Sequence, residues 1–192
     1  MKTATITPQD AISATRNWLR DIVIGLNLCP FAGLPFRKNT IRYQVSHAKT
    51  TDALLADLVE ALIVLHRADP DDIATTLLII PYMLQDFADY NDFLTVADAT
   101  LCELELEGII QIASFHPKYQ FAGCDPDALA NFTNRAPYPI LHLLREDDVS
   151  RAVATHPAIE RIPEDNIQRL QSLGEVQIKA LLKNCNNLRK CC

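Results

Sequence analysis

Glycine is scarce in this chain, which has 5 glycines and 11 prolines among its 192 residues. Loops that cradle nucleotide phosphates need several closely spaced glycines, so a site of that kind is not expected. Basic residues are few as well, because 18 lysines and arginines are set against 24 aspartates and glutamates, for a formal net charge of −6. Duplex nucleic acid is bound through clustered lysine and arginine, so we expect no nucleic-acid partner.

Long apolar runs are also missing. The most apolar stretch, residues 76–80, has the length of a strand, whereas a membrane span needs about 18 residues. Residues 1–8 contain no apolar leader segment. The composition, 48% hydrophobic and 22% charged, is that of a globular domain. We therefore expect a soluble, cytoplasmic domain without a membrane partner.

The six cysteines form no C-x-x-C pair, so neither a zinc ribbon nor a thioredoxin-type motif is expected and no metal site is assigned. A cytoplasmic chain of this size favours reduced thiols over disulfides. Three of the cysteines, Cys185, Cys191 and Cys192, fall in the last eight residues. We predict one domain over residues 1–174 and a C-terminal helical or flexible cysteine-containing tail over residues 175–192.

Helical and strand patterns alternate along the first two thirds of the chain. Thr7 and Pro8 are typical of a helix start, and Pro30 requires that helix to end before it. The apolar periodicity that follows predicts a strand at 41–46, a helix at 51–68, a strand at 76–80, a helix at 84–106, a strand at 109–115 and helical segments from 140 to 173.

Each link between consecutive predicted strands is long enough to hold a crossover helix. Such links favour parallel pairing, because an antiparallel pair needs only a short turn. We predict an α/β fold with a small, mostly parallel sheet of at least three strands, covered by helices. A ferredoxin-like α+β sheet is the alternative.

Polar side chains follow all three predicted strands. The strands end at Ser46–His47, at Pro81–Tyr82 and at Ser114–His116, and residues 114–139 then form a long connection without regular periodicity. Ligands of open parallel sheets bind outside the carboxyl ends of the strands, and long irregular connections are commonly functional. We therefore predict a small-molecule pocket built by segment 114–145.

His116 is the first candidate within this segment, because imidazole can act as an acid or a base near neutral pH. Its alternative role is to bind backbone in the loop. Arg135, with Asn131 and Asn134, offers donors suited to a carboxylate or phosphate, or else stabilises its own loop. Among the remaining candidates for this pocket, His142 and Arg145 share a face of the predicted helix from Ile140, and Tyr82 follows the second strand.

Two further residues have competing interpretations. Asp86 is a candidate acid or base beside the pocket, or the residue that complements the dipole of the following helix. With Asp89 and Asp92 it could also hold magnesium. Cys29 is a secondary candidate, a thiol nucleophile that would need a distant histidine, but its apolar neighbours favour a buried, inert thiol.

Several stretches resemble one known family. They are residues 25–32 around Cys29, 84–94 around Asp86, 113–121 around His116 and 131–146 around Arg135. They resemble the bacterial domain of unknown function 1415 family from about residue 8 to residue 174. The resemblance implies a small soluble bacterial protein, and it carries no activity, substrate, cofactor or residue role.

Three hypotheses of function follow. In the first, the chain is an enzyme acting on a small anionic metabolite, with His116 as acid or base. In the second, it is a non-catalytic module that binds a metabolite or a protein through the same loop and its aromatic residues. In the third, the loop is only a structural lid. The sequence identifies neither reaction, cofactor nor oligomeric state.

Overall fold

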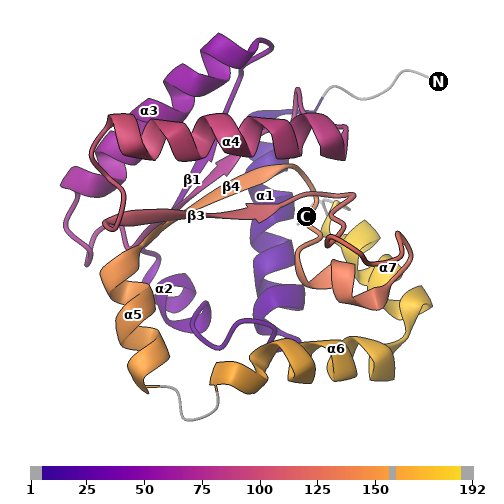
Figure 1. Ribbon diagram of the computed structural model, residues 1–192. Coiled ribbons are helices and arrows are strands. Elements are labelled where there is room, and N and C mark those ends of the chain that lie inside the picture. The colour runs from indigo at the N-terminus through magenta and orange to yellow at the C-terminus, as the bar shows by residue number, and fades with distance from the viewer. Residues whose placement is uncertain (1–5, 156–158, 187–192) are drawn as a thin grey trace, which may run out of the picture.

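A four-stranded sheet with helices on both faces forms the centre of the molecule. The computed structural model describes residues 6–155 and 159–186. The strands β1 (Ile41–Val45), β2 (Thr75–Ile79), β3 (Ile110–Phe115) and β4 (Ile140–Arg145) lie in the order β1-β2-β4-β3. Helices α3 and α4 cover one face, and α1 and α2 lie behind the other (Figure 1). The main helices are α1 (Pro8–Trp18), α2 (Gly33–Lys38), α3 (Thr51–Arg67), α4 (Phe87–Glu103), α5 (Glu146–Thr155), α6 (Ile162–Leu173) and α7 (Glu175–Cys185).

The sheet corrects the predicted topology. β1 and β2 are parallel, but β4 runs antiparallel to both β2 and β3, so the prediction of a mostly parallel sheet is wrong. The alternative prediction was a ferredoxin-like α+β sheet. An α+β layout of that kind has its helices on one face, whereas this sheet has helices on both faces. Because β4 opposes both of its neighbours, β1, β2 and β3 still point in one direction, toward the right in Figure 1.

The error arises at residues 140–144, which were predicted as helix and form β4. Leu141 and Leu143 face the core under α3 and α4, while Ile140 belongs to the core on the opposite face. With both sides of the strand buried, the apolar residues do not alternate with polar ones, and a short run of this kind has no diagnostic period. The predicted mixed α/β class, the first three strands and the helices at α1, α3 and α4 are confirmed.

The start of α1 has the predicted cap. Thr7 Oγ1 accepts a hydrogen bond from the Asp10 amide at 3.2 Å, and Asp10 Oδ2 accepts one from the Thr7 amide at 3.1 Å. The helix continues from Leu19 to Ile24 as a π-helical segment. A Cβ at Gly25 would lie 2.4 Å from the carbonyl oxygen of Asp21, so only glycine fits at the exit from this segment.

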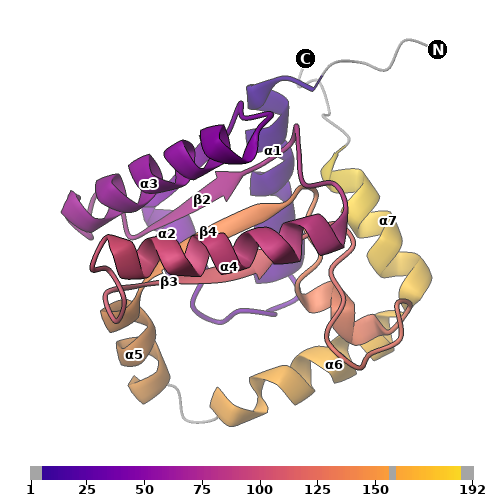
Figure 2. The same cartoon turned by 45° about the horizontal axis from the view of Figure 1, so that its top comes forward.

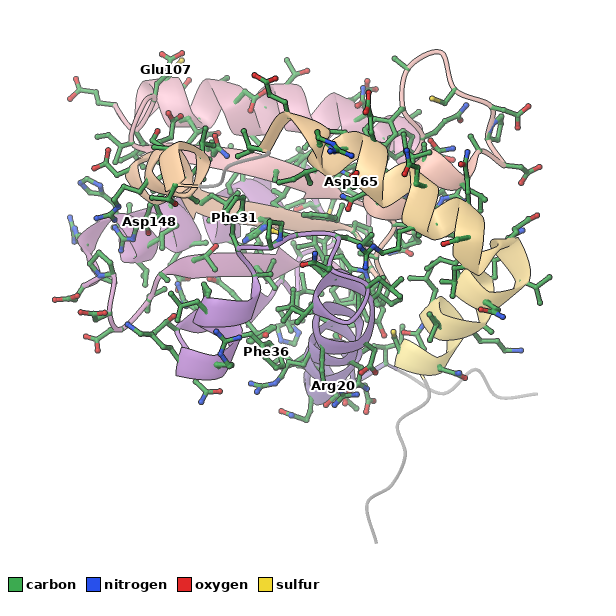
Figure 3. The ribbon with its side chains drawn as sticks, turned by 90° about the horizontal axis from the view of Figure 1, so that it is seen from below. Arg20, Phe31, Phe36, Glu107, Asp148 and Asp165 are labelled. Carbon is green, nitrogen blue, oxygen red and sulfur yellow. The ribbon has the colours of Figure 1, made fainter. Side chains whose placement is uncertain are left out.

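The second face of the sheet is covered by elements from both ends of the chain. Trp18 of α1, Leu170 of α6 and Ile178 of α7 belong to one buried cluster on this face. Figure 2 shows α7 alongside α1, and Figure 3 shows α5 and α6, marked by Asp148 and Asp165, across the lower end of the molecule. None of the described helices is long and apolar enough to cross a membrane.

Candidate functional site

The exits of the three co-directional strands meet at one edge of the sheet. The ring of His47, after β1, stacks on that of Tyr82, after β2, with 5.7 Å between the ring centres. The imidazole of His116, after β3, lies 3.0 Å from the carbonyl oxygen of Leu84, in the connection that follows β2. The polar residues that follow the strands are therefore neighbours in space, although β4 separates β2 from β3 within the sheet.

A hollow of about 390 Å³ opens at this edge. One wall is the start of α4, and the other is the connection between β3 and β4. Five of its eight lining residues are polar, and they include two carboxylates and two cations. The lining residues are Asp86, Phe87, Pro117, Lys118, Gln120, Pro126, Asp127 and Arg135.

His116 lies behind this hollow and is fully buried. Its Nδ1 accepts a hydrogen bond from the Lys118 amide at 3.0 Å, so Nε2 carries the proton and donates it to the Leu84 carbonyl. Burial lowers the pKa of His116, and the positive charge of Lys118 acts in the same direction. The neutral ring thus ties the loop after β3 to the loop after β2.

The two asparagines also hold backbone. Asn131 is fully buried: its Oδ1 accepts from the Phe121 amide at 3.0 Å, and its Nδ2 donates to the carbonyls of Asp125 and Pro126. Asn134 Nδ2 donates to the Ser114 carbonyl at 3.1 Å. These bonds fix the course of the long connection, because its buried backbone groups have few partners of their own.

The Arg135 side chain is held by two hydrogen bonds and still has free N–H donors. Its Nε donates to the Tyr119 carbonyl at 3.2 Å, its Nη2 to the Pro126 carbonyl at 2.7 Å, and its guanidinium lies 4.3 Å from the centre of the Phe132 ring. Nη1 donates to none of the described residues. Burial lowers the pKa of Arg135, an effect opposed by the negative charges of Asp127 and Glu175. The side chain is held rigidly at the hollow with donors to spare.

Three lining residues were not singled out in the sequence, namely Lys118, Gln120 and Asp127. All three lie inside the predicted irregular segment, so the signal for them was present. Lys118 and Asp127 are exposed, and neither side chain forms an ion pair with the described residues within 4.0 Å. Asp86 caps α4, since its Oδ1 accepts from the Ala88 amide at 2.9 Å, which fits the dipole interpretation.

His142 and Arg145 do not share a face, because they lie three residues apart on a strand. Thr75 Oγ1 donates its proton to the Leu143 carbonyl and therefore accepts from His142 Nε2 at 2.8 Å. Burial lowers the pKa of His142 to about 4. Arg145 Nη2 lies 2.6 Å and 2.7 Å from the carbonyls of Leu65 and Ala68, at the end of α3. Neither residue lines the hollow.

Tyr82 and Cys29 lie outside the hollow too. Tyr82 donates to the Ile6 carbonyl at 3.1 Å, and Cys29 packs at the edge of the buried cluster under α1. Cys29, Cys102, Cys124 and Cys185 are free thiols, whereas Cys191 and Cys192 fall outside the described residues. Within residues 6–155 and 159–186, no group of three histidine, cysteine or acidic side chains is placed to hold a metal ion.

Comparison with known proteins yields one match. The family model described as "Protein of unknown function (DUF1415)" matches residues 10–180, which confirms the family predicted from the resemblance. The match extends into α7, past the end of the resemblance at residue 174. No curated protein and no solved structure matches the chain.

Proposed function

Because the chain belongs to the DUF1415 family, whose function is unknown, we propose a function from the hollow itself: it binds a small anionic molecule. The observation that carries the proposal is the half-buried Arg135 guanidinium, fixed by two backbone carbonyls and an aromatic ring, with Nη1 left over. A planar guanidinium with spare donors favours a carboxylate or a phosphate.

Two further features favour a negative ligand. Lys118 adds a second cation to the lining, and the N-terminus of α4 points its dipole at the same space through Asp86 and Phe87. Asp86 and Asp127 offset part of this charge. A ligand that carries both an anionic group and hydrogen-bond donors would satisfy both kinds of side chain.

The volume of the hollow and its lining residues restrict the kind of ligand that it can bind. A hollow of about 390 Å³ matches small-molecule pockets, which run from roughly 300 to 1,000 Å³. The binding groups are side chains, in agreement with the scarcity of glycine in the chain. The five aromatic residues of the connection, Phe115, Tyr119, Phe121, Phe132 and Tyr138, are all buried or half-buried, so they offer no exposed patch for a protein partner.

The hypothesis of an enzyme acting on this ligand assigns distinct roles. Asp86 is exposed at the hollow and can exchange a proton with a bound molecule. Both ring nitrogens of His116 bind backbone, so His116 supports the proposal as a positioning residue. Its role as acid or base stays a prediction.

A thermal-shift screen of small carboxylates and phosphates tests binding. A ligand at about a hundredfold over its Kd stabilises by roughly 2.7 kcal/mol, which raises Tm by several degrees. We expect Lys118→Met to reduce or abolish that shift, because it removes a cation without removing any described side-chain bond. Lys49→Met, at an exposed lysine that does not line the hollow, is the matched control.

Once a ligand is found, a test of turnover distinguishes an enzyme from a non-catalytic binding module. A substrate is converted by the wild type and bound but not converted by Asp86→Asn, which keeps the helix cap. A ligand that neither the wild type nor Asp86→Asn converts indicates that the chain is a binding module. A screen without hits, or a shift that Lys118→Met leaves unchanged, would contradict the proposed site.

A further inference from the structure

Helix α3 is apolar on two opposite sides. The side toward the sheet is fully buried and consists of Leu54, Leu58, Ala61, Leu62 and Leu65. The opposite side has Leu55, Val59 and Ile63 at intervals of four residues, with Val64 beside them. One apolar stripe is enough to attach a surface helix to its domain, and a helix that is apolar all round is normally buried.

The four residues of the second stripe are half-buried, and no other described helix or strand packs over them. A shallow hollow of about 560 Å³ runs along it and is lined by α3 residues alone. None of Leu55, Val59, Ile63 and Val64 packs in the core cluster beneath the helix. Figure 2 shows α3 at the margin of the molecule, with no other described helix or strand beyond it on that side.

The charges along this side of α3 differ between its two ends. Asp52 lies in the first turn, and His66 and Arg67 lie in the last, all three exposed. Asp52 and Arg67 form no ion pair with the described residues. Glu60, the other acidic lining residue, lies 3.5 Å from Arg42 of β1. The free charges are therefore acidic at one end of the stripe and basic at the other.

Val59 is the midpoint of the 17-residue helix. About this residue the stripe is nearly symmetric, with Leu55 four positions before it and Ile63 four after. Asp52 lies seven positions before it and Arg67 eight positions after it, so the opposite charges are nearly equally distant from the centre. A surface that is self-complementary under a twofold rotation is the kind that forms an isologous dimer.

We propose that the outer side of α3 binds a second copy of this chain, with the two α3 helices antiparallel and the twofold axis at Val59. Leu55 of each copy packs against Ile63 of the other. Asp52 of each copy faces His66 and Arg67 of the other. Antiparallel packing also opposes the two helix dipoles. This interface uses no residue of the hollow at Arg135, so its test does not depend on the proposed ligand.

Sedimentation equilibrium of the full chain over a wide concentration range tests the interface. A reductant is present because Cys102 is exposed and could cross-link chains. We expect a monomer–dimer equilibrium that Val59→Arg abolishes. The matched control is Val96→Arg, the same change at a 37% exposed valine on the neighbouring helix α4. Circular dichroism confirms that both variants keep their helices.

Charge reversal tests the register. Asp52→Arg and Arg67→Asp should each raise the dimer Kd by about tenfold, since each turns two attractive contacts into repulsive ones. The double variant should recover the wild-type Kd, because the swapped charges pair again. Each reversal also opposes the helix dipole, so loss of helix stability would accumulate in the double variant and could not produce this recovery.

Three results would overturn the inference. They are a wild type that is monomeric at every concentration, a Val59→Arg variant that still dimerises, and single charge reversals that leave Kd unchanged. A helix of an unrelated protein as the natural occupant would give the first of these.

Discussion

Replacing Tyr90 by phenylalanine removes a single oxygen atom, yet it should lower the free energy of unfolding substantially. Tyr90 of α4 is fully buried, and its hydroxyl donates to the Ile140 carbonyl at 2.8 Å while accepting from the Phe115 amide at 3.2 Å. These two residues are paired at the edge where the candidate site opens. Burial raises the pKa of Tyr90, so its hydroxyl stays protonated at every working pH.

The magnitude follows from the groups left behind. Tyr90→Phe keeps the ring, and with it the contacts to Phe87 and His116, but leaves a carbonyl and an amide without this partner. Each buried polar group left unpaired costs about 1–3 kcal/mol. The free energy of unfolding should fall by about 2–4 kcal/mol, and Tm by about 2–4 °C for each kcal/mol.

Urea denaturation and a thermal melt measure the loss. Tyr119→Phe is the matched control, because the Tyr119 hydroxyl forms no hydrogen bond with the described residues and its removal should cost about 0.5 kcal/mol or less. Hydrogen exchange at the Phe115 amide should accelerate in Tyr90→Phe alone. Equal stability of the two variants would refute the conclusion that the hydrogen bonds of the Tyr90 hydroxyl hold α4 to the strand ends.

Three more predictions concern Asn131, which holds the connection at the site, and two side chains of β4. The free energy of unfolding of the wild type should fall by about 2 kcal/mol between pH 7 and pH 5, because His142 must gain a proton on unfolding: its pKa rises from about 4 to 6.5. Fluorescence-monitored urea unfolding at both pH values should show a smaller fall in His142→Gln. Asn131→Ala should cost about 2–4 kcal/mol by the same assay, and should speed proteolysis of the connection that it holds. Arg145→Met should destabilise to a similar degree, since it strips the cap from the end of α3, while ligand affinity at the hollow stays unchanged in a thermal-shift titration.

Periodicity predicted the elements that have one buried face or clear boundaries. Helix α3 ends one residue before the predicted limit, and β2 begins one residue early. β4 was missed because Leu141 and Leu143 pack on one side of the sheet while Ile140 packs on the other. A strand buried on both faces lacks a period of two, and nothing local shows that it inserts between β2 and β3. Its position depends on tertiary contacts.

The edge of the sheet at which the hollow opens was easier to predict than the residues that line the hollow. Strand ends carry polar residues, and three co-directional strands bring them to one edge even though β4 runs the other way. Residue type then favoured His116 and Asn131, which are fully buried, over Lys118, which is exposed at the hollow. Burial is a property of the folded chain, and a single sequence does not separate a histidine that binds backbone from one that binds a ligand.

The polar residues of the connection between β3 and β4 divide into two groups by what they bond. A long connection packed against a domain must satisfy its own amides and carbonyls. His116 and Asn131 bond backbone with both polar ends of their side chains, and Asn134 does so with its Nδ2, while its Oδ1 accepts from the Thr133 hydroxyl. Arg135 is intermediate, since two of its nitrogens bond backbone and Nη1 does not. The ammonium group of Lys118 bonds no described side chain or carbonyl. The donors that remain after the backbone is satisfied are cationic and line one hollow together with the carboxylate of Asp127, and they are the basis of the proposal that this hollow binds an anion.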